Sequence, residues 1–189
     1  MALETTLSYD DEPVEIVDAA GRPLAVIPAA AAHRQSLPHK AVLALFFDRE
    51  TRIVLTKRKP SAQAYPGRWD LPGRGHVRPG EAFLDAAKRL AEPLFPGRCG
   101  QFRFACALPA TRDTAFEALC VFCCRLAEIP LTLESLPPKE ELLAVNADEM
   151  TALAADFREL FTPEVVNAFE SGWLFDDQGA PPPGPPAGG

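Results

Sequence analysis

The chain has 189 residues, of which 47% are hydrophobic and 24% are charged, a composition typical of a globular protein rather than a disordered or fibrous one. Nineteen Lys and Arg against 26 Asp and Glu give a net charge of −7, which disfavours nucleic acid as a partner. No stretch approaches the ~20 consecutive apolar residues of a spanning helix, and the first residues lack the basic and apolar regions of a signal peptide, so we expect a cytoplasmic protein without a membrane partner.

The chain divides into three parts by composition. Residues 1–12 are acidic and form an N-terminal extension. The tail at 176–189 is rich in Pro and Gly and has no apolar periodicity, so we expect it to be disordered. The remaining residues, 13–175, have the length of a single domain.

The first half of this domain shows two predicted hairpins. Residues 14–17 and 23–27 are apolar segments of strand length, separated by a turn at 18–21. Residues 42–47 and 53–56 form a second such pair, joined by a polar segment.

A loop and a helix follow the second hairpin. Residues 65–80 hold four Gly and three Pro in sixteen positions, a density that neither a helix nor a central strand is expected to tolerate. Residues 81–94 place apolar side chains at helical spacing, with Asp85 and Arg89 paired at i,i+4 on another face. We therefore predict a long structured loop that leads into an amphipathic helix.

The second half is predicted to contain strands at 102–108 and 116–126 and helices at 147–160 and 163–171. Three of the five cysteines lie in the second of these strands, at 120, 123 and 124. Because no second Cys or His pair stands at zinc-ribbon spacing, we interpret this run as a buried strand with reduced thiols. The order of elements favours a mixed α/β sandwich.

The loop and helix resemble the Nudix superfamily. Its signature is a Gly, five residues, a Glu, seven residues and then Arg-Glu-aliphatic-x-Glu-Glu-x-Gly, and Gly75, Glu81 and Arg89 match the first half. The segment YPGRWDLPGRGHV is similar to the loop before the signature in the isopentenyl-diphosphate isomerase-like subgroup. The resemblance implies a Nudix-type α/β/α sandwich with a mixed sheet, a small phosphorylated molecule as partner and Mg²⁺ or Mn²⁺ as cofactor.

The second half of the signature is degenerate. The positions of its three further glutamates hold Leu90, Pro93 and Leu94, and an apolar stripe there is expected to pack into a core. Glu81 and Glu92 are the remaining candidates for catalysis, Glu81 also as a metal ligand. Alternatively, Glu81 is an acidic residue of the first helical turn and Glu92 is a solvated carboxylate.

A second metal site is implied by the same resemblance. His33, His39 and His76 fall where the isomerases have histidines of their metal site, and Glu117 matches one of that site's two glutamates, while Ala115 replaces the other. Three imidazoles and a carboxylate suit a transition metal. The alternative is that His33 and His39 are isolated imidazoles that face the solvent, and that the Gly75-His76 pair has no metal role.

Candidate substrate-binding residues lie in a basic segment at 49–78. Arg58, Arg68 and Arg74 are expected to hold phosphate, with Trp69 as a stacking surface, and the alternative is a solvated hairpin with Trp69 buried. Arg74 also stands where the isomerases have a cysteine. Because an always-charged guanidinium supplies neither an acid nor a base, we do not expect isomerase activity.

Two functions therefore remain open. The first is a metal-dependent hydrolase of a small nucleoside or organic diphosphate, whose carboxylates include Glu81, Glu92 and loop residues such as Glu140 or Glu141. The second is a catalytically inactive Nudix-fold module that binds a phosphorylated ligand. The sequence is compatible with a homodimer.

Overall fold

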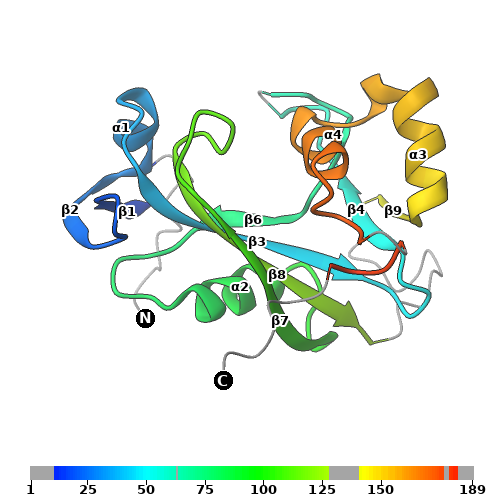
Figure 1. Cartoon of the computed structure of the whole chain (residues 1–189), viewed down its shortest axis with the longest axis horizontal. Coiled ribbons are helices and arrows are strands. Elements are labelled where there is room, and N and C mark those ends of the chain that lie inside the picture. The colour runs from blue at the N-terminus through cyan, green and yellow to red at the C-terminus, as the bar shows by residue number, and fades with distance from the viewer. Residues whose placement is uncertain (1–10, 63, 128–140, 177–178, 183–189) are drawn as a thin grey trace.

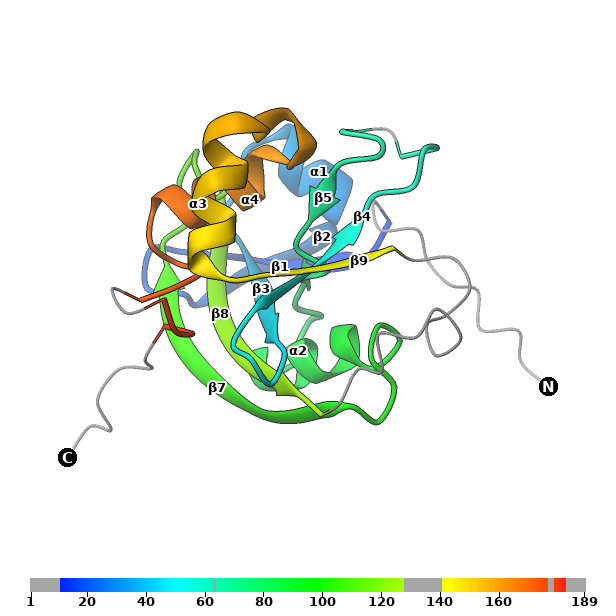
Figure 2. The same cartoon turned by 90° about the vertical axis from the view of Figure 1, so that its right-hand side faces the viewer.

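The computed structural model describes residues 11–62, 64–127, 141–176 and 179–182. Within them, one mixed sheet lies between two helical layers (Figures 1 and 2). Helix α2 (Phe83–Ala91) covers one face, and helices α3 (Ala147–Asp156) and α4 (Pro163–Glu170) cover the other. The predicted α/β/α sandwich with a mixed sheet is confirmed. Most of the predicted N-terminal extension and tail lies outside the described residues.

Strand β3 (His39–Phe47) is the centre of the sheet. It pairs in parallel with β8 (Glu117–Leu126) along its whole length and antiparallel with β6 (Gly73–His76). Strands β1 (Pro13–Val17) and β4 (Ile53–Lys57) contact its two ends. Every residue of β3 except Lys40 is buried, because a central strand between two helical layers is covered on both faces.

The side chains of β3 alternate between the two layers, as the two-residue period of a strand requires. One set packs in the core with α3 and α4: Ala41, Leu43, Leu45 and Phe47. The other set packs with α2 and the residues that follow it: Val42, Ala44 and Phe46. The alternation fixes which residues can face a site on the α4 side of the sheet.

The predicted hairpins are confirmed. Strand β1 pairs with β2 (Pro23–Pro28), and β3 pairs with β4 at Phe47 and Ile53. Strand β7 (Cys99–Leu108) pairs antiparallel with β8, and β9 (Leu142–Val145) lies beside β4. The cysteine run is part of β8, and the five thiols are free, as predicted.

The glycine-rich loop contains two strands that we did not predict, β5 (Trp69–Asp70) and β6. The physical reason is close packing. A Cβ on Gly73 would lie 2.2 Å from the Ala44 carbonyl oxygen, and one on Gly75 would lie 2.7 Å from a Leu90 methyl group. The glycines that indicate a loop are therefore also what lets β6 fit against β3 and α2.

Three helical elements also differ from the predictions. A short helix, α1 (Ala29–Arg34), follows β2 and was not expected. Helix α2 ends at Ala91 rather than at residue 94, before Pro93. The predicted helix at 147–160 is divided into α3 and a 3₁₀ turn, η1 (Arg158–Leu160). No helix in the described part of the chain is long and apolar enough to cross a membrane.

Candidate metal centre and pocket

The register of the sheet places three of the candidate ligands on one face. His39 and Glu117 are direct neighbours across the parallel β3–β8 pair. His76 lies opposite Ala41, two residues further along β3. Because residues i and i+2 of a strand share a face, all three side chains project toward the α4 side. The small side chain of Ala41 leaves room between them.

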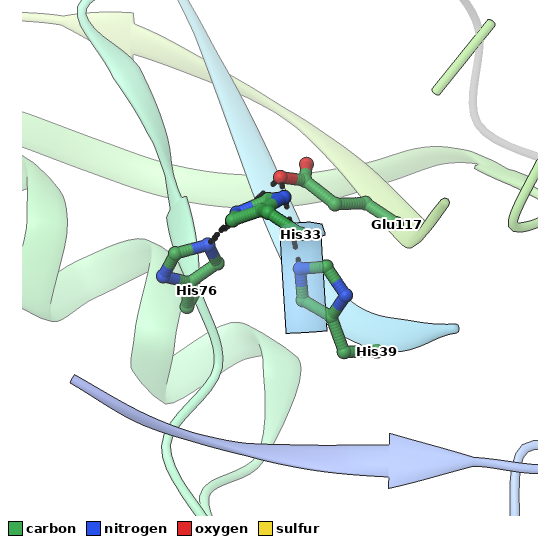
Figure 3. A group of neighbouring side chains, drawn as sticks. All are labelled: His33, His39, His76 and Glu117. Carbon is green, nitrogen blue, oxygen red and sulfur yellow. Dashed lines mark hydrogen bonds and ion pairs between the residues drawn. The ribbon is translucent and has the colours of Figure 1, made fainter. Parts of the chain in front are cut away.

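Helix α1 supplies the fourth residue, His33, from its last turn. Ala29 and Ala32 of this helix pack with Val14 and Ile16 of β1, and this contact holds the helix over the end of β3. Figure 3 shows the four side chains turned toward a common point. One candidate ligand atom from each of His33, His39, His76 and Glu117 lies within 4.8 Å of the others, and we call this group the histidine–glutamate cluster.

The distances inside the cluster fit a metal site. The Nε2 atoms of His33 and His76 are 3.1 Å apart, and Glu117 Oε1 lies 4.0 Å from His39 Nε2 and 3.9 Å from His76 Nε2. Metal bonds of ~2.0–2.2 Å in a tetrahedral site separate ligand atoms by roughly 3.3–3.6 Å. The distances fall on both sides of that range, so a cation needs only small side-chain movements.

A hydrogen bond to the main chain fixes which ring nitrogen of His39 is the donor. Its Nδ1 lies 2.8 Å from the Leu37 carbonyl oxygen. Since a carbonyl oxygen only accepts, Nδ1 is the donor of this hydrogen bond, which leaves Nε2 as the nitrogen that can offer a lone pair to a metal. This Nε2 atom is buried and has no hydrogen-bond partner among the described residues. A buried acceptor without a donor is costly unless a cation or another group satisfies it.

His76 is held in the form that binds metals. The pKa of its ring is lowered to about 4, chiefly by burial; the nearby His39, His33 and Arg74 also lower it, and the charge of Glu117 opposes them. The imidazole is therefore neutral at pH 7, with a lone pair on one nitrogen.

Glu117 is oriented by Arg74. The carboxylate is almost fully buried, and its Oε2 accepts hydrogen bonds from Arg74 Nη2 at 2.8 Å and Nε at 3.1 Å. The same guanidinium lies 3.5 Å from the Thr114 carbonyl oxygen. Because Oε2 is occupied by the arginine, Oε1 faces His39 and His76.

A pocket of about 670 Å³ opens beside the cluster, and His33, Arg74 and Glu117 form part of its wall. A second part of the wall is cationic and comes from the exit of β4: Lys57, Arg58 and Lys59. A third part is apolar: Leu43, Leu71, Leu94, Leu119 and Trp173. The pocket thus combines a candidate metal centre, a cationic side and an apolar side.

Arg58 forms an ion pair with Asp70 at the pocket wall. Its Nη1 donates to Asp70 Oδ2 at 2.6 Å, while Asp70 Oδ1 accepts from the Thr162 hydroxyl at 2.9 Å. The Nε atom of Arg58 is buried and makes no hydrogen bond within the described residues. Sequence reasoning missed Asp70, because a single aspartate in a loop carries no spacing signal.

Arg68 and Trp69 are not among the residues that line this pocket. Arg68 donates to the Phe161 carbonyl oxygen at 3.2 Å, and its guanidinium lies 5.3 Å from the centre of the Tyr65 ring. Trp69 is half-buried against the core, and the Lys57 ammonium lies 5.5 Å from the centre of its ring.

Glu81 lies outside the histidine–glutamate cluster and braces the loop that carries His76. It accepts two hydrogen bonds from Arg89, at 2.7 and 2.8 Å, and one from the Arg78 backbone N–H at 2.9 Å. Burial opposes ionisation, but these hydrogen bonds and charges lower the pKa of Glu81 overall. Arg89 also donates to the His76 carbonyl oxygen at 2.9 Å. The carboxylate nearest to Arg89 is thus that of Glu81, and the predicted pairing with Asp85 is not found among the described residues.

The degenerate half of the signature has an apolar role, as predicted. Leu90 packs with the α2 core against Gly75, and Leu94 packs near Phe95 and reaches the pocket wall. Glu92 is exposed at the end of α2 and does not belong to the cluster. Glu141 pairs with Lys57 at 2.7 Å, and Glu140 lies outside the described residues.

Comparison with known proteins agrees with this architecture. The family model described as "NUDIX domain" matches residues 37–92. The chain is 39% identical over 111 residues to an isopentenyl-diphosphate Delta-isomerase of Nocardia farcinica, covering 56% of this chain and 63% of that protein. It is 30% identical over 141 residues to the Cutibacterium acnes protein of the same name, covering 74% of this chain and 69% of that protein.

The chain spans about three fifths of the length of the first of these relatives. Among solved structures, DR0079 from Deinococcus radiodurans aligns with a TM-score of 0.66 and 16% identity, covering 85% of this chain and 98% of that one, which shows the fold. Family match, relatives and fold together show that the chain belongs to the Nudix superfamily.

Proposed function

We propose that this protein is a metal-dependent enzyme that hydrolyses a small organic diphosphate in the pocket beside the histidine–glutamate cluster. The observation that carries the proposal is the convergence of three imidazoles and one carboxylate within 4.8 Å at a pocket wall. The buried Nε2 of His39, which has no hydrogen-bond partner in the part of the chain that the structure describes, supports a cation there.

The donor set favours a transition metal. Imidazole nitrogens suit transition metals such as Zn²⁺ and Fe²⁺, whereas Mg²⁺ prefers oxygen ligands and keeps several waters. Of Mg²⁺ and Mn²⁺, we therefore propose Mn²⁺. A divalent cation bound by His33, His39, His76 and Glu117, with a further coordination position open, would supply a Lewis acid that activates water and neutralises phosphoryl charge.

The other walls of the pocket suit the rest of such a substrate. Lys57, Arg58 and Lys59 offer charge-assisted hydrogen bonds to phosphate oxygens, and the buried Nε of Arg58 is one donor without a protein partner among the described residues. The apolar wall suits the organic group. Arg74 holds Glu117 so that one carboxylate oxygen faces the histidines.

Hydrolysis is proposed in preference to isomerisation, although the similar proteins are named isopentenyl-diphosphate Delta-isomerases. Arg74 lies directly beside Glu117, and its guanidinium keeps its proton in proteins. This position therefore provides neither an acid that gives a proton to carbon nor a base that removes one.

A second candidate is a binding module without catalysis. It is favoured by Leu94, which lines the pocket wall where the superfamily signature has a glutamate. In such a module the pocket and its cations would hold a diphosphate, and the cluster would have a structural role.

The test is phosphate release from a panel of nucleoside and isoprenoid diphosphates by protein stripped with chelator and then supplied with Mn²⁺ or Mg²⁺. We expect turnover that needs the metal and is abolished by Glu117→Gln but not by Glu159→Gln, which changes an exposed carboxylate. Metal-dependent binding without turnover would favour the binding module. Conversion of isopentenyl diphosphate to its allylic isomer in the same panel would overturn the choice of hydrolysis.

A further inference from the structure

We propose that Glu12 is a positioning residue for the metal centre, acting through His76. This inference rests on the proposed function, because it assumes that His76 binds a cation. Glu12 Oε2 lies 3.6 Å from His76 Nδ1, on the side of the ring away from the cluster. The Glu12 side chain is 15% exposed and that of His76 is fully buried.

The chemistry of an imidazole ligand explains the placement. When Nε2 gives its lone pair to a cation, the single proton of the neutral ring stands on Nδ1. An acceptor beside Nδ1 then fixes the tautomer and the orientation of the ring and makes the ligand more basic. The present separation is an ion-pair distance, and a shift of less than about 1 Å would give a charge-assisted hydrogen bond.

Two arginines hold the Glu12 carboxylate in this position. Its Oε1 lies 3.2 Å from Arg78 Nε and 3.8 Å from Arg89 Nη1. Arg89 also binds Glu81 and the His76 carbonyl oxygen. The carbonyl oxygen and Nδ1 of His76 therefore both contact the same network of charged side chains.

His39 provides an internal parallel. Its Nδ1 faces the Leu37 carbonyl oxygen at 2.8 Å, so its orientation is fixed by a main-chain acceptor. Glu12 would do for His76 what this carbonyl does for His39. An acidic residue before the first strand has no motif or spacing that would have revealed this role in the sequence.

Glu15 offers a matched control. Its side chain is 13% exposed, it pairs with Lys40 at 2.7 Å, and it accepts a hydrogen bond from the Gly80 N–H at 3.0 Å. It therefore resembles Glu12 in charge, burial and attachment to the same loop. It has no hydrogen bond or ion pair to a residue of the cluster.

The experiment measures Zn²⁺ affinity by competition with a chromophoric chelator, and the absorption spectrum of the Co²⁺-loaded protein, for the wild type, Glu12→Ala, Glu12→Gln and Glu15→Ala. Loss of a group that hydrogen-bonds a metal-binding histidine weakens metal binding by about 10–100-fold. We expect this weakening for Glu12→Ala, together with a changed Co²⁺ spectrum. Glu12→Gln keeps an acceptor and should lose less. Glu15→Ala should match the wild type, and thermal melts of the metal-free proteins show whether each variant is folded.

The results that would overturn the inference alone differ from the result that would overturn the proposed function as well. Wild-type affinity and spectrum in Glu12→Ala, with metal bound by the wild type, would overturn the inference and leave the metal centre intact. Equal losses in Glu12→Ala and Glu15→Ala would overturn it as well, since the effect would then be general. A wild type that binds neither Zn²⁺ nor Co²⁺ would overturn the proposed function, and the inference with it. If Glu12→Ala does not fold, Glu12→Gln decides, and affinity equal to that of Glu15→Ala would overturn the inference.

Discussion

Replacing Arg74 by alanine should leave the buried carboxylate of Glu117 without its ion-pair partner. In the wild type, Oε2 of this carboxylate accepts two hydrogen bonds from the guanidinium, at 2.8 and 3.1 Å, and the Glu117 side chain is 3% exposed. Removing one partner of a buried ion pair leaves a charge without compensation. We therefore expect Arg74→Ala to destabilise the metal-free protein strongly.

The magnitude follows from the burial of the two partners. Breaking a fully buried pair costs about 3–5 kcal/mol. Because the Arg74 side chain is 27% exposed, solvent reaches part of the pair, and we expect about 2–3 kcal/mol. For a domain of this size that corresponds to a fall of roughly 5–10 °C in Tm.

The assay is urea unfolding of chelator-treated protein in a double-mutant cycle. Glu117→Gln removes the charge, so in the Arg74→Ala background it should recover most of the lost stability, with a coupling of at least about 1 kcal/mol. Arg22→Ala is the control: it removes an arginine that is 78% exposed from a 2.7 Å pair with Asp18, and its unfolding midpoint should stay close to that of the wild type. Equal effects of Arg74→Ala and Arg22→Ala, or additivity in the cycle, would refute the reasoning.

Three further predictions concern the elements around the site. Gly75→Ala should cost about 1–3 kcal/mol in urea unfolding, since its Cβ meets the movable end of Leu90, and Gly73→Ala should cost more, because its Cβ meets a backbone oxygen at 2.2 Å. Glu81→Gln should destabilise the protein most at neutral pH, because the pKa of Glu81 is lowered in the folded state. The stability that this carboxylate contributes is present above its unfolded pKa near 4.5 and is lost as the pH falls through the folded pKa. A stability difference from the wild type that does not narrow in acid would contradict this. Leu94→Glu places a carboxylate on the pocket wall and should not raise the rate of phosphate release, because the proposed reaction uses the histidine–glutamate cluster; a gain in rate would show that the missing signature glutamate limits the protein.

Most of the fold could be predicted from local patterns. The alternating and continuous apolar runs predicted both hairpins and the strand with the cysteines, and the helical spacing after residue 81 predicted α2. Strand β6 could not be predicted, because its glycines disfavour a strand locally and are explained only by the close approach of Ala44 and Leu90. Helix α1 is only six residues long, too short for a periodic signal.

The candidate site was predictable where a resemblance guided it. That comparison selected His33, His39, His76 and Glu117, and the sheet register supplies the physical reason why they meet. The ion-pair partners of the charged residues were harder to predict from the sequence. Helix spacing pairs Arg89 with Asp85, whereas the folded loop brings Glu81 to Arg89. Such pairings depend on contacts between segments distant in sequence, which local patterns do not contain.

The most direct test of the account is the metal content of the protein after chelation and dialysis against Mn²⁺ or Zn²⁺, measured for the wild type and for His39→Ala. We predict one tightly held ion per wild-type chain, and loss of that ion in His39→Ala with the fold retained. No bound metal in the wild type, or an ion retained unchanged by His39→Ala, would contradict the assignment of the histidine–glutamate cluster as the metal centre.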